Sequence, residues 1–313
     1  MSRSRAAGRA RPIAGTAQAA RAIGSLPGRL VVAVVVVVWS LPAAGVLITS
    51  FQPADTATTS GWWSVVGDPQ LTVDNYRQVL GAGSAGGDLF QGFLASVAVA
   101  VPATLAPLGL AAVAAYAFAW ARFAGRDWLF LAVVALALVP LQMTLVPLVS
   151  AYSDGVRVFG IPIVPDLGLA GSWLGLWMAH TAFALPIAVL VLRGAMAAIP
   201  SHLVDAARTD GASHLDVFAR VVVPLSVPAL AAVAALQFLW VWNDFLVASA
   251  LLGRIEPGTS PITLGLAALV ESRGQELHLL SAGTVVTAAV PLVVFVVLQR
   301  LVVQGAHAAT FDQ

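Results

Sequence analysis

The sequence predicts an all-α membrane protein with six transmembrane helices. Hydrophobic residues make up 59% of its 313 residues and charged residues only 10%, whereas soluble domains carry about 25% charged residues. Six segments are long enough to cross a bilayer, which takes about 20 mostly apolar residues. A chain of this composition cannot keep its apolar surface out of water without a lipid environment.

The six predicted spans follow one another along the chain, separated by more polar stretches. They cover residues 30–51, 93–119, 128–151, 170–196, 228–252 and 279–303. The first apolar run exceeds the ~7–15 residues of a signal-peptide core, so we expect a retained anchor. Several spans contain proline, which predicts kinks, although proline is common in membrane helices generally. Residues 30–303 are therefore expected to form the membrane domain, between a tail at 1–29 and a second tail at 304–313.

Arginine distribution predicts the orientation of the chain. All 16 basic residues are arginine. Twelve of them lie on the side of the N-terminal tail, and the other four, Arg77, Arg157, Arg254 and Arg273, lie on the opposite side. The positive-inside rule then places both termini in the cytoplasm. The tail 1–29 is rich in Ala, Gly and Arg, which favours disorder and contact with anionic lipid.

Two loops are expected on the opposite, external side. Residues 52–92 form a long loop in which Trp62 and Trp63 are candidate interface anchors. Residues 253–278 form a polar loop with several charges. Both could be held by a soluble partner.

Missing residue types exclude several kinds of chemistry. The chain has no lysine and no cysteine, which removes the P-loop lysine, thiolate metal sites and cysteine nucleophiles. Its five histidines show no metal-binding spacing. The sequence therefore predicts no catalytic residue, metal site or cofactor in this chain, and a net charge of +1 gives no reason to expect a nucleic acid partner.

Polar and aromatic residues cluster in the predicted fifth span. On a continuous helix Gln237, Trp240 and Asp244 share one face, and Asn243 adjoins them. A charge inside a membrane marks a pathway or a buried pair, and aromatic rings beside hydrogen-bonding groups suit a sugar. Gln142 in the third span is a second polar candidate. Helix packing would explain the same residues, so a substrate pathway and a packing cluster both stay open.

The stretch 199–224, between the predicted fourth and fifth spans, is too polar to cross a membrane. Ser201 suits an N-cap, and Gly211 suits the left-handed position that ends a helix. A second helix should follow and end before Pro224. Two short helices along the membrane surface could dock into a partner's groove, although an ordinary loop would show the same pattern.

This stretch resembles the EAA loop of ABC-importer permeases. The family pattern is Glu-Ala-Ala, three residues, Gly and a later Pro, and here Asp205-Ala206-Ala207 precedes Gly211 and Pro224. Further stretches are similar to the carbohydrate-importing, maltose-type branch, namely 115–126, 139–147, 183–186, 199–200 and 242–245. The segment 270–280 is similar to the α-glucoside branch. The resemblance covers about residues 48–305.

The resemblance implies a type I importer permease fold in which 199–224 is a cytoplasmic coupling loop. Asp205 would accept a charged hydrogen bond from a separate ATPase, and small neighbours would allow close packing. Aspartate in place of the family's glutamate is one methylene shorter, which puts the usual salt bridge in doubt. The implied coupling residues are Asp205, Ala206, Ala207, Asp210, Gly211, Ala212, Phe218 and Pro224.

The family also implies partners and a function. The partners are a second permease subunit, a dimer of ATP-binding subunits that holds ATP and Mg, and an extracytoplasmic sugar-binding protein. The expected function is ATP-driven import of an oligosaccharide or α-glucoside. A secondary transporter and an intramembrane enzyme are the alternatives, but the sequence shows neither an internal repeat nor convergent catalytic groups.

Overall fold

The computed structural model describes residues 26–81, 89–158, 161–166, 168–253, 258–273 and 276–308. Helices dominate this part of the chain, and one small antiparallel hairpin pairs Val158 with Ile161. The elements are α2 (Leu26–Thr49), α3 (Ala54–Thr59), η1 (Trp62–Val66), α4 (Asp74–Leu80), α5 (Leu89–Trp120), α6 (Arg126–Leu136), α7 (Leu141–Asp154), β1 (Val156–Val158), β2 (Ile161–Val164), α8 (Trp173–Ala197), α9 (Ser201–Thr209), α10 (His214–Val217), η2 (Phe218–Val222), α11 (Val223–Leu225), α12 (Val227–Trp242), α13 (Leu246–Leu252), α14 (Ile262–Arg273) and α15 (Leu277–Ala308).

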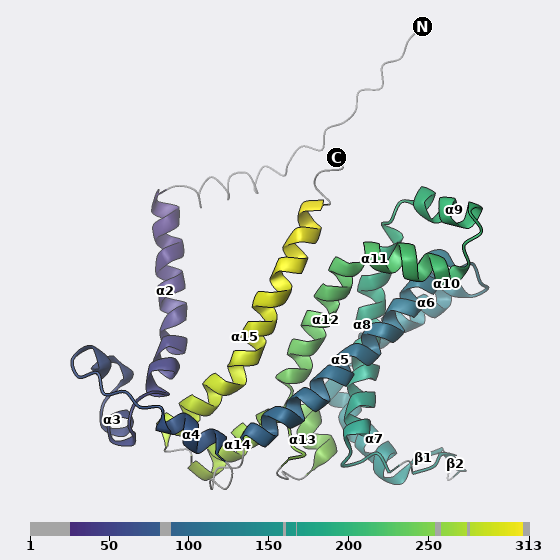
Figure 1. The fold of residues 1–313 in the computed structure, drawn as a ribbon. Coiled ribbons are helices and arrows are strands. Elements are labelled where there is room, and N and C mark those ends of the chain that lie inside the picture. The colour runs from purple at the N-terminus through teal and green to yellow at the C-terminus, as the bar shows by residue number, and fades with distance from the viewer. Residues whose placement is uncertain are drawn as a thin grey trace.

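The long helices run between two ends of the molecule (Figure 1). At one end lie α9, α10 and α11, together with the start of α2 and the end of α15. At the other end lie α3, α4, α14 and the hairpin. This arrangement puts the stretch 199–224 on the same side as the start of α2 and the end of α15, as the arginine distribution requires.

Helix α5 is central to the packing. It makes its most extensive contact with α8, and it also packs against α12 and α14. Two clusters of buried apolar residues follow from this. One surrounds Trp242, which stacks on Phe238 and meets Phe93 edge-on. The other joins α5 and α8 to the α9–α11 segment around Met196 and Val204.

Helix α2 differs from α5 because nearly all its apolar side chains are exposed. A helix that is apolar all round needs lipid or a partner to cover it. This agrees with a membrane protein. The predicted tail 1–29 lies outside the described residues except for 26–29, which belong to α2, and of the tail 304–313 only 304–308 are described, as the end of α15.

The expected six spans appear in a broken form. Within the described residues, four helices are long and apolar enough to cross a membrane, or up to six if each of two bent pairs counts as one span. The predicted third span, 128–151, is not one helix, because α6 and α7 meet at 95°. Pro140 precedes α7 with extended backbone, and since proline has no N–H it cannot continue the helical ladder. The count of six spans stays a prediction.

The expected polar loop 253–278 contains a helix that the sequence reading missed. Helix α14 buries Ile262, Leu264 and Leu269 against the rest of the bundle. Its first N–H, from Ile262, donates to the Ser96 hydroxyl oxygen of α5 over 2.8 Å. The run 262–270 is apolar but too short for a span, so counting charges alone classed it as loop. The candidate anchors Trp62 and Trp63 both lie in η1, where Trp62 is half-buried beside Gly45 and Trp63 is exposed.

Candidate coupling segment and substrate pathway

Helix α9 ends in the way that the glycine predicts. Gly211 has a φ of +86°, the left-handed conformation that glycine adopts without strain. The Gly211 N–H donates to the Arg208 carbonyl and the Ala212 N–H to the Ala207 carbonyl, both over 3.0 Å. This pair of bonds is a Schellman motif, which satisfies the last carbonyls of the helix. The start differs by one residue, because Pro200 is the N-cap and Ser201 is already helical.

The second helix begins with a capping box. The Ser213 hydroxyl accepts from the Asp216 N–H, and the Asp216 carboxylate accepts from the Ser213 N–H. The Ser213 hydroxyl also donates to this carboxylate, and these bonds hold the pKa of Asp216 below its usual range. The helix does not end before Pro224 as expected. A π turn, η2, follows α10 and continues without a break into α11, which contains Pro224.

Exposure separates the predicted coupling residues into two groups. Asp205, Ala206, Asp210, Gly211 and Pro224 are exposed, and Ala207, Ala212 and Phe218 are half-buried. Val204, which precedes Asp205 in α9, is fully buried, at 0% exposed. The segment therefore has one face held against the bundle and one face free for a partner.

The predicted pathway residues do not all share one helical face. Helix α12 ends at Trp242, where the Asn243 side chain donates back to the Leu239 carbonyl over 2.7 Å. Asp244 lies beyond the helix, so the expected spacing with Gln237 and Trp240 is wrong. A polar side chain that bonds nearby backbone groups competes with the helical hydrogen bonds, and the Asn243 side chain does so at the end of α12.

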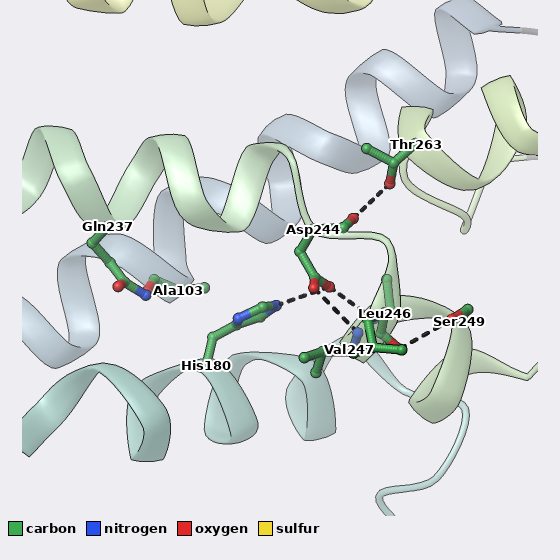
Figure 2. Close-up of polar contacts among 9 residues, drawn as sticks. Ala103, His180, Gln237, Asp244, Leu246, Val247, Ser249 and Thr263 are labelled. Atoms are coloured by element: carbon green, nitrogen blue, oxygen red, sulfur yellow. Dashed lines mark hydrogen bonds and ion pairs between the residues drawn. The ribbon is translucent and has the colours of Figure 1, made fainter. Parts of the chain in front are cut away.

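Asp244 joins three elements (Figure 2). Its carboxylate accepts from the Val247 and Ala248 N–H groups over 3.1 and 2.8 Å and so caps the first turn of α13 from one residue before the N-cap Phe245. Its backbone carbonyl accepts from the Thr263 hydroxyl over 2.7 Å. The Nε2 atom of His180 on α8 lies 3.7 Å from the carboxylate, and both side chains are buried, at 1% and 8% exposed.

Gln237 points from α12 toward α5 and donates to the Ala103 carbonyl over 3.2 Å (Figure 2). It also lines a cavity of about 290 Å³ between α5, α8 and α12, whose walls are otherwise almost entirely apolar. A second hollow of about 520 Å³ lies at the break between α6 and α7. Trp240 and Ile187 line both spaces, so the Trp240 indole stands where they meet. Gln142, Asn243 and Asp244 line neither.

Among the described residues, no group of three or more His, Asp or Glu side chains could hold a metal ion. A comparison with protein families gives a match over residues 107–307 to the "binding-protein-dependent transport system inner membrane component". The match covers α6–α14, the C-terminal part of α5 from Pro107 onward and nearly all of α15. The chain belongs to this family of ABC-transporter permeases.

Two curated permeases resemble this one over most of its length. It is 44% identical to an osmoprotective compounds uptake permease of Synechocystis over 284 residues, 90% of each chain. It is 45% identical to the alpha-glucoside transport system permease AglG of Rhizobium meliloti over 239 residues, 76% of this chain and 59% of that one.

A solved structure shows the same fold. It is a bacterial alginate ABC transporter in complex with an alginate pentasaccharide-bound periplasmic protein, with a TM-score of 0.63 at 14% identity over 90% of this chain and 96% of that one. The expected permease fold is thereby confirmed. The chain is a multi-pass inner-membrane transport subunit, and the secondary-transporter and enzyme alternatives fall away.

Sequence reasoning about this permease missed three residues near the candidate sites. Val204 anchors α9, Arg208 donates from α9 to the Trp120 carbonyl of α5, and His180 faces Asp244. One signal was available for Val204, since an apolar residue three positions before Ala207 lies on the same helical face. The Arg208–Trp120 and His180–Asp244 contacts join residues more than 60 positions apart, so local sequence spacing cannot predict them.

Proposed function

We propose that this chain is one permease subunit of an ATP-driven importer of oligosaccharides or α-glucosides. The observation that carries the proposal is the 45% identity to a permease named for alpha-glucoside transport. The identity extends over 239 residues, far beyond the coupling segment that all such permeases need. The similar segment 270–280, most of it within α14 and the start of α15, agrees with this branch.

The α9 segment is proposed to dock in a cleft of a cytoplasmic ATPase that binds ATP and Mg. Support comes from the exposed face formed by Asp205, Ala206 and Gly211, which has no covering element in the part of the chain that the structure describes. The Asp205 carboxylate would accept a charge-assisted hydrogen bond there. Both chain termini would then be cytoplasmic, as the arginine excess requires.

The opposite end of the molecule is proposed to receive sugar from an extracytoplasmic binding protein. The family description names a binding-protein-dependent system, and the alginate transporter was solved with its periplasmic protein. A second permease subunit would cover the exposed apolar surface of α8 and α12. Trp240, with Gln237 beside it, is the candidate sugar contact of this subunit, because aromatic faces suit sugar rings and it lines both hollows.

Affinity purification of the tagged chain from its native membrane in mild detergent tests this proposal. Mass spectrometry should recover a P-loop ATPase and a second multi-span permease. The reconstituted complex should then hydrolyse ATP faster with maltose, trehalose or sucrose and a matching binding protein than without sugar. Recovery of the chain alone, folded and monodisperse, would overturn the importer. Recovery of the full complex with no response to any of the three sugars would overturn the α-glucoside assignment.

A further inference from the structure

The turn at Gly211 between α9 and α10, called the elbow below, contacts one helix, α5, through the residues on both of its sides. Before the elbow, the Arg208 Nη2 atom of α9 donates to the Trp120 carbonyl over 3.3 Å. After the elbow, the Nδ1 atom of His214 lies 3.0 Å from the Tyr116 hydroxyl oxygen. Trp120 is the last residue of α5, and Tyr116 stands one turn before it on the same face.

The Arg208 contact pairs a carbonyl that has no partner within its own helix. The last carbonyls of a helix have no partner within it. A guanidinium at that position also interacts favourably with the negative end of the helix dipole. The Trp120 indole in turn donates to the Met196 carbonyl at the end of α8 over 3.1 Å. Polar contacts therefore tie α9 to α5, and α5 to α8, at their adjoining ends.

Apolar packing closes the same joint. The Tyr116 side chain is 8% exposed, and its ring meets Phe218 edge-on with centroids 5.3 Å apart. Val204 and Val217 are fully buried in the same cluster. The joint is thus dense as well as hydrogen-bonded, and a dense interface transmits displacement instead of absorbing it.

The other end of the connection is the cavity. Thr104, Pro107 and Leu108 of α5 line the space of about 290 Å³ beside Gln237. Pro107 and Tyr116 lie nine residues apart on one helix, about 14 Å along its axis. A movement imposed on the last turns of α5 therefore reaches the wall of the cavity through a single element.

We propose that Tyr116 and Arg208 are positioning residues, which fix the Gly211 elbow to the end of α5 so that a displacement of α9 moves α5 with it. This inference rests on the proposed function, because it needs an ATPase that displaces α9. Neither residue touches sugar or nucleotide in this scheme. Their effect is on how much sugar moves for each ATP hydrolysed.

The test uses the complete importer in proteoliposomes, with whichever of maltose, trehalose and sucrose stimulates the wild-type ATPase most. Tyr116→Phe keeps the ring and removes the hydroxyl, and Arg208→Gln removes the charge. Arg220→Gln is the matched control, because Arg220 is an exposed arginine of the same segment whose ion pair is with Asp216. The readout is the ratio of sugar taken up to ATP hydrolysed, measured beside the amount of assembled complex.

We expect Tyr116→Phe and Arg208→Gln each to lower this ratio about fivefold, which corresponds to about 1 kcal/mol, the net contribution of one hydrogen bond. Arg220→Gln should keep the wild-type ratio, and Arg208→Lys should restore part of it. Replacing His214 with alanine in the Tyr116→Phe background should add little, since the bond is already lost. A purely structural role would reduce the amount of complex but leave the ratio unchanged.

Two outcomes contradict different claims. If the ATPase co-purifies and Tyr116→Phe and Arg208→Gln keep the ratio of Arg220→Gln, the positioning role is overturned and the importer stands. If no ATPase accompanies the wild-type chain, the proposed function itself fails, and the positioning role fails with it.

Discussion

Gly211 allows a test that separates strain within this chain from contact with a partner. Its φ is +86°, and a Cβ atom added there would meet nothing within 4 Å. A side chain at 211 therefore starts into open space, and its main cost in the isolated subunit is backbone strain. The strain is roughly 1–2 kcal/mol for an ordinary residue and smaller for asparagine, which tolerates the left-handed region.

Docking into an ATPase cleft changes this ranking. Alanine and tryptophan carry a similar backbone strain, but only tryptophan projects a large group into the space that a partner would occupy. Overpacking of a closed contact typically costs about 1–3 kcal/mol, which is about a 5- to 150-fold loss in the docking equilibrium. Gly211→Trp should therefore uncouple hydrolysis from uptake, while Gly211→Asn stays near wild type and Gly211→Ala lies between them.

Three measurements read this series together. The thermal midpoint of each purified subunit reports strain, co-purification of the ATPase reports docking, and sugar uptake per ATP in proteoliposomes reports coupling. The subunit midpoints of Gly211→Ala and Gly211→Trp should agree. Uptake by Gly211→Trp at the rate of Gly211→Ala would show that nothing approaches this elbow closely, and the docking of α9 would be refuted.

Three further predictions follow from individual contacts. Asp244→Ala should lower the thermal stability of the subunit by about 1 kcal/mol through loss of the α13 cap, whereas Asp244→Asn should keep most of it; equal midpoints for the two variants would argue against capping. Ser96→Ala should leave the buried Ile262 N–H unpaired at a cost of about 1–3 kcal/mol and speed hydrogen exchange at the start of α14, an effect that Ser96→Thr should not share. Because hydrogen bonds from Ser213 lower the pKa of Asp216, this cap stabilises the fold fully above the ordinary value of 3.8 and is lost as the pH falls through the lowered pKa. The difference in thermal midpoint between wild type and Asp216→Asn should therefore shrink on acidification, and a constant difference would contradict it.

Length and apolarity predicted the long helices well, because a membrane span needs little beyond a sufficient apolar run. The breaks within the predicted spans were harder to predict. Proline predicts a bend in the third span, which contains Pro140, but a 95° turn between α6 and α7 depends on how both halves pack. The end of α12 depends on Asn243 and Asp244 bonding backbone groups on either side of them. In the sequence these two residues suit substrate ligands equally well, because nothing there shows which backbone groups they bond.

Helix α14 shows a different limit. Its apolar run is too short to indicate a membrane span. Its first residue, Ile262, is buried against Gly92 and Ser96 of α5, more than 160 residues away in the sequence. A Cβ atom at Gly92 would lie only 3.2 Å from the Ile262 Cα atom, so close approach of the two helices depends on the missing side chain. Contacts at such separation leave no periodic signal in a single sequence. The same holds for the Arg208 and His214 contacts that join the coupling segment to α5.

The choice between pathway and packing for the fifth-span cluster can be argued residue by residue. The Asp244 carboxylate accepts two backbone N–H bonds and lies 3.7 Å from His180, so a passing sugar would have to displace those partners. The Gln237 amide already donates to Ala103. Trp240 is different, because it is 39% exposed and lines both hollows. We therefore expect any sugar contact from this cluster to be stacking on the indole face, with hydrogen bonds supplied largely by the partner permease and the binding protein.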